Sequence, residues 1–71
     1  MDKKTLEFVI FMIHACSHKW GKSCSEVYKT LNDSGILDDY LIQHYEVLHT
    51  LGEQYLVEDV TGFVHDRGYQ I

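Results

Sequence analysis

Hydrophobic residues recur at helical spacing near the start of the chain and predict a first helix over residues 4–18. The stripe expected to be buried comprises Leu6, Val9, Ile10, Ile13, Ala15 and Cys16. The six-residue apolar run inside this segment could also form a buried strand. The length of the segment, and the lack of turn residues before Gly21, favour a helix.

Three further apolar residues, Phe8, Phe11 and Met12, lie on a flank that a simple amphipathic helix would leave polar. A helix that is apolar on so many sides must be covered on more than one of them. We therefore expect this flank to contact a partner protein or, in a homodimer, the first helix of a second copy.

Residues typical of helix ends mark the second helix. Gly21 can adopt the positive φ that ends the first helix. The sequence SCSE at residues 23–26 is a capping box, in which Ser23 and Glu26 bond each other's backbone amides. The helix should run to about Asn32 and close at residues 34–35. Its inward residues are expected to be Val27, Tyr28 and Leu31.

A third helix is expected after Asp38, which can cap it. Its buried stripe would be Leu41, Ile42, Tyr45 and Leu48. The helix either continues through Thr50 and stops at Gly52 or breaks near His44. Residues 50–53 also match a capping box that would start a new helix. Glycine is not particularly favoured near a helix start, so we prefer Gly52 as the end of the third helix.

The last part of the chain suggests a short extended segment, Tyr55–Val57, and a closing helix, Val60–Arg67, capped by Asp59. This helix would turn Val60, Phe63 and Val64 inward. No repeat, linker or low-complexity tract divides the chain. The pattern thus predicts one all-α domain over residues 1–71, a compact bundle of about four short helices with a short extended segment before the last.

Composition agrees with a small globular domain, because 45% of the 71 residues are hydrophobic and there is no proline. The net charge of −5 is unevenly distributed. Residues 1–30 contain five lysines and three acids, whereas residues 31–71 contain Arg67 and eight acids, a net charge of −7. This acidic half disfavours nucleic acid and suits a basic protein partner, although an acidic surface is also common in soluble proteins.

Two cysteines, Cys16 and Cys24, define no disulfide framework and are expected to be reduced thiols in the cytosol. Lys3-Lys4 and the apolar run before Cys16 loosely resemble a lipoprotein signal. However, Glu7 and His14 interrupt that run, and it is too short to span a bilayer. A cytoplasmic location is therefore expected.

Five histidines raise the question of a metal site. His14 and His18 share one helix face, and Cys24 could approach them after the turn. No fourth ligand and no CxxC pair is present, so neither a metal nor another cofactor is expected. A Cys–His nucleophile is not favoured either, since nothing orients such a pair. We expect the chain not to be an enzyme.

The adjacent acids at residues 38–39 and 58–59 coincide with expected helix starts, so capping explains them without catalysis.

Residues 25–48 could alternatively form a helix-turn-helix of a DNA-binding regulator. Its recognition helix, DDYLIQHYEVLH, would contain three acids and no lysine or arginine, which disfavours phosphate and guanine contacts. Tyr40, Tyr45 and Tyr55 offer amphipathic surface of the kind enriched at protein interfaces.

The segment DYLIQHYEVLHTLGEQYLVEDV, with SEVY at residues 25–28 and FVHDRG at residues 63–68, resembles the small bacterial domain-of-unknown-function family 3791. That resemblance implies a short cytosolic protein, often encoded beside another small protein. One neighbour type resembles an ADP-ribosyltransferase. It thus implies a non-catalytic, antitoxin-like or regulatory partner of the neighbouring gene product, a protein-interaction module, and supplies no catalytic residues.

Overall fold

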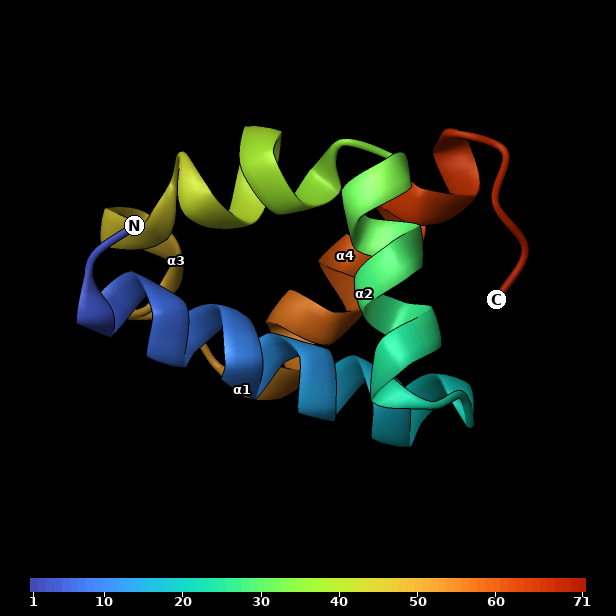
Figure 1. The fold of residues 1–71 in the computed structure, drawn as a ribbon, viewed down its shortest axis with the longest axis horizontal. Helices are drawn as coiled ribbons and strands as arrows, with labels where there is room; N and C mark the ends of the chain where they lie inside the picture. The colour runs from blue at the N-terminus through green and yellow to red at the C-terminus, as the bar shows by residue number, and fades with distance from the viewer.

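Five helical segments follow one another in the computed structural model, which describes residues 1–71 and contains no strand (Figure 1). They are α1 (Lys3–Trp20), α2 (Cys24–Asp33), the π-helical segment η1 (Leu37–Ile42), α3 (Tyr45–Leu48) and α4 (Glu53–Asp66). The all-α prediction is confirmed. None of these helices combines the length and apolar character needed to cross a membrane.

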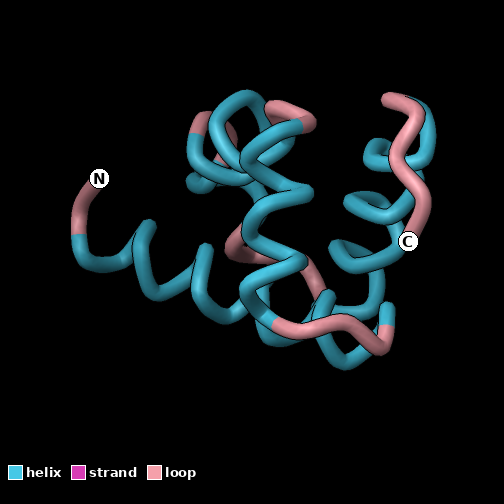
Figure 2. The backbone as a smooth tube through the Cα atoms, turned by 45° about the vertical axis from the view of Figure 1, so that its right-hand side comes forward, coloured by secondary structure: helices cyan, strands magenta, loops and turns pink.

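The helices enclose one apolar core. In Figure 1, α1 lies along the bottom of the view, η1 runs above it, and α2 crosses in front of α4. Figure 2, turned by 45°, shows that most of the chain is helical, with short loops between helices. The core has 14 buried hydrophobic residues contributed by all five segments. Trp20 ties α1 to α4, because its indole N–H donates a 2.9 Å hydrogen bond to the Thr61 hydroxyl.

Helix α1 is capped at both ends. The Asp2 carboxylate accepts a 2.8 Å hydrogen bond from the Thr5 amide, and this bond lowers the pKa of Asp2. Gly21 has φ of 68° and donates from its amide to the Ser17 carbonyl, which ends the helix as expected. The capping box of Ser23 and Glu26 is also confirmed.

The buried face of α1 differs from the expected stripe. Phe8 and Met12, assigned to a partner-binding flank, are 9% and 0% exposed and belong to the core. Leu6 and Ile10, assigned to the core, are each 46% exposed. Both sets are apolar, so the sequence could not decide which side of α1 the other helices cover.

The third helix breaks near His44, as one of the two alternatives predicted. Segment η1 ends at Ile42, His44 has φ of −106°, and the four-residue helix α3 follows. Asp38 does not cap η1, because Ile36 holds the N-cap position and no side chain bonds there. The expected stripe is nevertheless inward, with Leu41 and Leu48 buried.

The predictions of an extended segment and of a last helix that starts at Val60 were wrong. Tyr55–Val57 lies inside α4, which begins at Glu53 with Gly52 as its N-cap. Gly52 thus precedes a helix instead of stopping one. Leu56 and Val57 continue the buried spacing of Val60 and Val64, so one longer helix buries all four.

Two other residues expected to face inward are partly exposed. Tyr28 on α2 is 49% exposed and Phe63 on α4 is 38% exposed. Their neighbours Val27, Leu31, Val60 and Val64 are fully buried. The expected orientations of α2 and α4 were therefore correct, but the buried stripe of each is narrower than its apolar stripe in the sequence.

Candidate interaction surfaces

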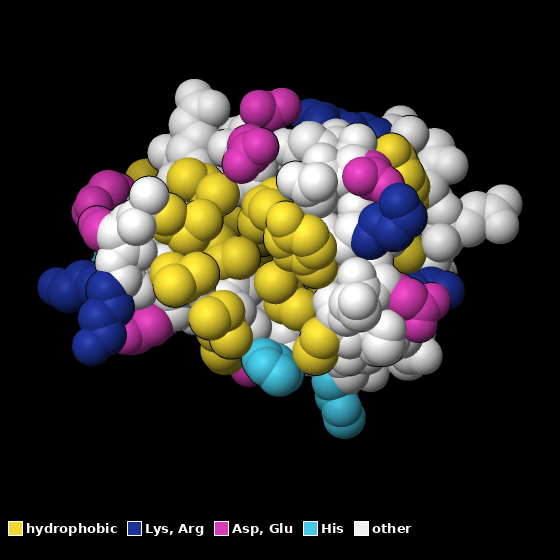
Figure 3. Space-filling model, in the orientation of Figure 1, with side chains coloured by type: hydrophobic (Ala, Val, Ile, Leu, Met, Phe, Trp, Pro, Cys, Tyr) yellow, Lys and Arg dark blue, Asp and Glu magenta, His cyan; other side chains and the backbone are white.

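One flank of α1 presents apolar side chains to solvent. Leu6, Ile10 and Ile13 follow one another at helical spacing on one side of the helix. The first two are 46% exposed, and Ile13 is half-buried against the core. We call these three residues the α1 face. Figure 3 shows hydrophobic side chains gathered over α1 and over the space between α1 and η1.

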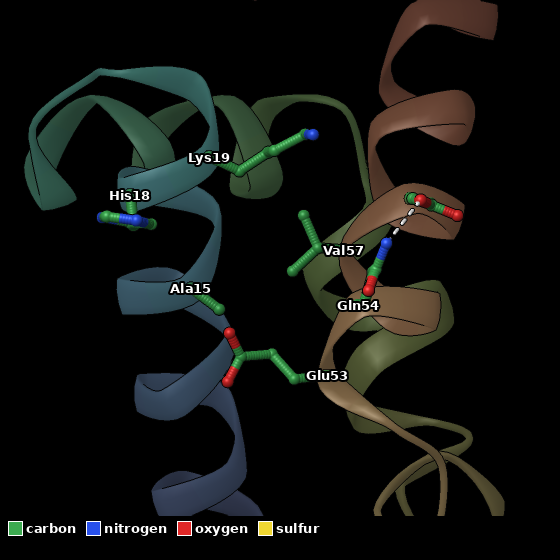
Figure 4. Close-up of a pocket in the computed structure, with 7 residues that line it drawn as sticks. Ala15, His18, Lys19, Glu53, Gln54 and Val57 are labelled. Atoms are coloured by element: carbon green, nitrogen blue, oxygen red, sulfur yellow. Dashed lines mark hydrogen bonds between the residues drawn. The ribbon is translucent and has the colours of Figure 1, made fainter.

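The opposite flank of α1 faces α4. Phe11 is 43% exposed, and Ala15 lies one turn further along the same side. Ala15, His18 and Lys19 line a hollow of about 240 Å³ whose other wall is α4 (Figure 4). Phe11 is thus the one member of the expected phenylalanine and methionine flank that remains at the surface.

The hollow between α1 and α4 carries opposite charges on its two walls. Lys19 reaches over Val57 from α1, while Glu53 on α4 extends toward Ala15 (Figure 4). Gln54 donates a 3.5 Å hydrogen bond to Glu58 along α4. The chain's ion pairs are Lys29–Asp33 and Arg67–Asp39, so no ion pair closes the hollow. Its volume is below the usual 300–1,000 Å³ or so of small-molecule pockets and suits a single side chain.

Tyr40 is fixed by contacts within the chain. Its hydroxyl donates a 2.9 Å hydrogen bond to the Asp59 carboxylate, and its ring meets Phe63 edge-on with centroids 4.9 Å apart. Burial, together with the bond to the negative Asp59, raises the pKa of Tyr40 well above its usual value. This tyrosine joins η1 to α4.

The other two tyrosines differ in exposure. Tyr45 is half-buried between Phe8, with ring centroids 5.5 Å apart, and His49, which stacks on it at 4.6 Å. Tyr55 is 55% exposed on α4. Of the three tyrosines expected to form a binding face, only Tyr55 is mostly free to contact another molecule.

The structure separates the three candidate metal ligands. The His14 Nδ1 atom and the Cys24 Sγ atom are 3.5 Å apart, so the expected approach of Cys24 takes place. His18 lines the hollow instead, and no group of three potential ligands forms. Cys16 is buried, which raises the pKa of its thiol to about 12 and keeps it protonated.

The two pairs of adjacent acids differ in position. Asp38 and Asp39 lie in the first turn of η1, at a helix start as expected, although no side chain caps the segment. Glu58 and Asp59 lie inside α4, where Asp59 accepts the Tyr40 hydroxyl bond. The expected helix start at residues 58–59 was wrong, because α4 begins six residues before Asp59.

The segment that would be the recognition helix of a helix-turn-helix is not one continuous helix. It is divided into η1 and the four-residue α3, with a turn between them. A major-groove reader needs a helix that presents several side chains in a row. This division, like the lack of lysine and arginine in the segment, disfavours a recognition helix for DNA.

The chain was also compared with known proteins. The family model described as a protein of unknown function, DUF3791, matches residues 7–67, which is most of the chain. The chain belongs to this family. No curated protein and no solved structure gives a significant match. The DUF3791 match includes Ile10, Ile13 and every residue of the hollow, and Leu6 immediately precedes it.

Sequence reasoning did not identify the α1 face or the hollow. It placed Leu6 and Ile10 in the core, gave no role to Lys19, and considered Glu53 only as part of a capping box. The hollow joins residues 34 to 43 positions apart, and only the crossing of α1 and α4 brings them together. Their spacing in the sequence contains no signal for that crossing.

Proposed function

We propose that this DUF3791 protein is a non-catalytic protein-interaction module that binds a partner through the α1 face. The observation that carries the proposal is the exposure of Leu6 and Ile10, 46% each, on a helix whose other side is the core. Exposed apolar side chains grouped on one surface are typical of protein-binding sites.

The α1 face is a suitable anchor because it belongs to a rigid element. Capping at both ends and the buried residues Val9, Met12 and Cys16 fix α1 against the core, so its exposed flank needs little ordering on binding. Fully burying a leucine or isoleucine contributes about 1.5–3 kcal/mol, so covering the exposed halves of Leu6 and Ile10 would contribute about 1 kcal/mol each.

Charge favours a basic partner. Residues 31–71 have a net charge of −7, and the exposed Asp38 and Asp39 of η1 lie on a segment packed beside α1. A partner with apolar side chains at its centre and lysine or arginine at its rim would match this arrangement. Such complementary charges raise association rates and select among partners more than they raise affinity.

We propose that the partner is the product of a neighbouring gene in the cytoplasm and that binding restrains its activity, as an antitoxin does. The resemblance to family 3791 motivates this choice, because one neighbour type resembles an ADP-ribosyltransferase. The chain itself would contribute binding and no reaction.

Co-expression with the neighbouring gene product, followed by affinity purification, tests the proposal. The wild-type chain should co-purify with that product and relieve any growth defect that the product causes. The double variant Leu6→Ser/Ile10→Ser should lose both effects while keeping its helical circular dichroism. The matched control is Val47→Ser on α3, which changes a 64% exposed apolar side chain outside the α1 face. Equal co-purification of the double variant, or none by the wild type, would overturn the proposal.

A further inference from the structure

His14 and Cys24 form a contact that the proposed function does not use. His14 lies on the exposed side of α1, and Cys24 is the first residue of α2. The Nδ1 and Sγ atoms are 3.5 Å apart. Gly21 ends α1 and the capping box starts α2, so the three-residue turn between the helices is fixed at both ends.

This separation matches one edge of a tetrahedral metal site. Zinc lies about 2.3 Å from a thiolate sulfur and about 2.0 Å from an imidazole nitrogen, which at a tetrahedral angle puts S and N about 3.5 Å apart. A linear two-ligand ion such as Cu(I) would need the sum of its two bond lengths, about 4 Å. The separation is that of a direct hydrogen bond between thiol and imidazole, and it also fits a tetrahedral ion that accepts sulfur and nitrogen.

One chain supplies only half of such a site, since no third histidine, cysteine or acid joins the pair. His14 is exposed and Cys24 is partly exposed, so a second molecule can reach both. A two-fold axis through the ion would bring the same two residues from another copy. We propose that His14 and Cys24 form half of a zinc site that a second copy of this chain completes with its own pair.

The chemistry of the four ligands suits zinc. Each Cys24 thiol would release its proton to water and bind as thiolate, and each His14 would bind through Nδ1 with the remaining proton on Nε2. Two thiolates balance the charge of one Zn²⁺ ion, so the completed site is neutral. Two cysteines and two histidines are a common structural zinc set.

The site should be tested on the full chain, reduced and freed of metal by a chelator. Titration with ZnCl₂, followed by sedimentation velocity, should convert the chain to a dimer with one zinc ion per two chains. CoCl₂ should give the absorption bands of tetrahedral thiolate-bound cobalt. Chelator should reverse both changes. These readouts involve no partner protein, so their failure is distinguishable from failure of the proposed function.

Cys24→Ser and His14→Gln should each abolish metal-dependent dimerisation and the cobalt bands while leaving circular dichroism unchanged. His18→Gln, which changes the histidine one turn further along α1, should keep both. Dimerisation by Cys24→Ser, one zinc bound per chain without dimerisation, or the absence of zinc binding at micromolar concentration would overturn the proposal. So would a loss of binding in His18→Gln, because the ion would then rest on the histidine pair of α1.

Discussion

The hydroxyl of Tyr40 donates a 2.9 Å hydrogen bond to the carboxylate of Asp59, 19 residues away. The bond joins η1 to the middle of α4, and the Tyr40 and Phe63 rings form a T-shaped pair beside it. Asp59 had been expected to cap a helix. Its position inside α4 makes it the acceptor that holds the third segment of the chain to the last helix.

Replacing Tyr40 with phenylalanine should lower the free energy of unfolding by about 1 kcal/mol, the usual net contribution of a hydrogen bond. The ring and its contact with Phe63 are kept, so the change isolates the bond to Asp59. Chemical denaturation monitored by circular dichroism measures the difference. Tyr55→Phe, which changes an exposed tyrosine, should have little effect. An equal loss in both variants would contradict this role.

The same bond predicts a loss of stability at alkaline pH. The pKa of Tyr40 is raised in the folded chain, by burial first and by Asp59 second. A group with a raised folded pKa stabilises the fold below its unfolded pKa, about 10 for tyrosine, and this contribution is lost as pH rises further. Wild-type stability should therefore fall more steeply above about pH 10 than that of Tyr40→Phe. Parallel curves of unfolding free energy against pH would contradict the prediction.

Met12 and Phe11 are adjacent in sequence but should respond very differently to truncation. Met12 is fully buried, so Met12→Ala should remove about 2–5 kcal/mol of stability by leaving a cavity. Phe11 is 43% exposed, so Phe11→Ala should cost much less. Thermal unfolding of the two variants measures the contrast. A larger effect at Phe11 would mean that α1 is rotated about its axis relative to this structure.

The orientation of α1 also shows what the sequence could not determine. Its apolar residues cover most of the circumference, so periodicity predicts a helix but not which apolar flank is buried. Helix α2 has a clear polar side, and there Val27 and Leu31 were predicted correctly. Orientation is predictable where polar residues exclude one side, and on α1 it depends on how α2 and α4 pack.

The prediction for the end of the chain was wrong for a different reason. Gly52 and the apolar Tyr55–Val57 are locally compatible with a stop and an extended segment. In the fold, a helix from Glu53 buries Leu56 and Val57 together with Val60 and Val64, and this packing outweighs the local preference.

Among the candidate sites, the approach of Cys24 to His14 was predictable because only a short turn separates their helices. The hollow required the crossing of α1 and α4.

Two glycines should give opposite results when replaced with alanine. Gly35 has φ of +84°, and an added Cβ would lie 2.9 Å from Nη1 of Arg67, which donates to the Ser34 carbonyl. Gly35→Ala should therefore destabilise the chain by at least about 1 kcal/mol. Gly62 lies inside α4 with nothing near its Cβ position, so Gly62→Ala should stabilise it by about 0.5–1 kcal/mol. Melting temperatures that shift in the same direction would contradict this pair of predictions.

The start of α2 depends on two reciprocal bonds, from the Glu26 amide to the Ser23 hydroxyl and from the Ser23 amide to the Glu26 carboxylate. Ser23→Ala should cost about 1 kcal/mol in urea unfolding, whereas Ser25→Ala, one position into the helix and without a capping bond, should cost little. The bonds from Ser23 lower the pKa of Glu26, so their stabilisation is present above the ordinary glutamate pKa and is lost as pH falls through the lowered value. Wild-type stability should therefore fall in acid, whereas that of Glu26→Gln, which has no carboxylate to protonate, should fall less. An equal loss of stability in the two proteins between neutral pH and about pH 4 would show that the carboxylate takes no part in the cap.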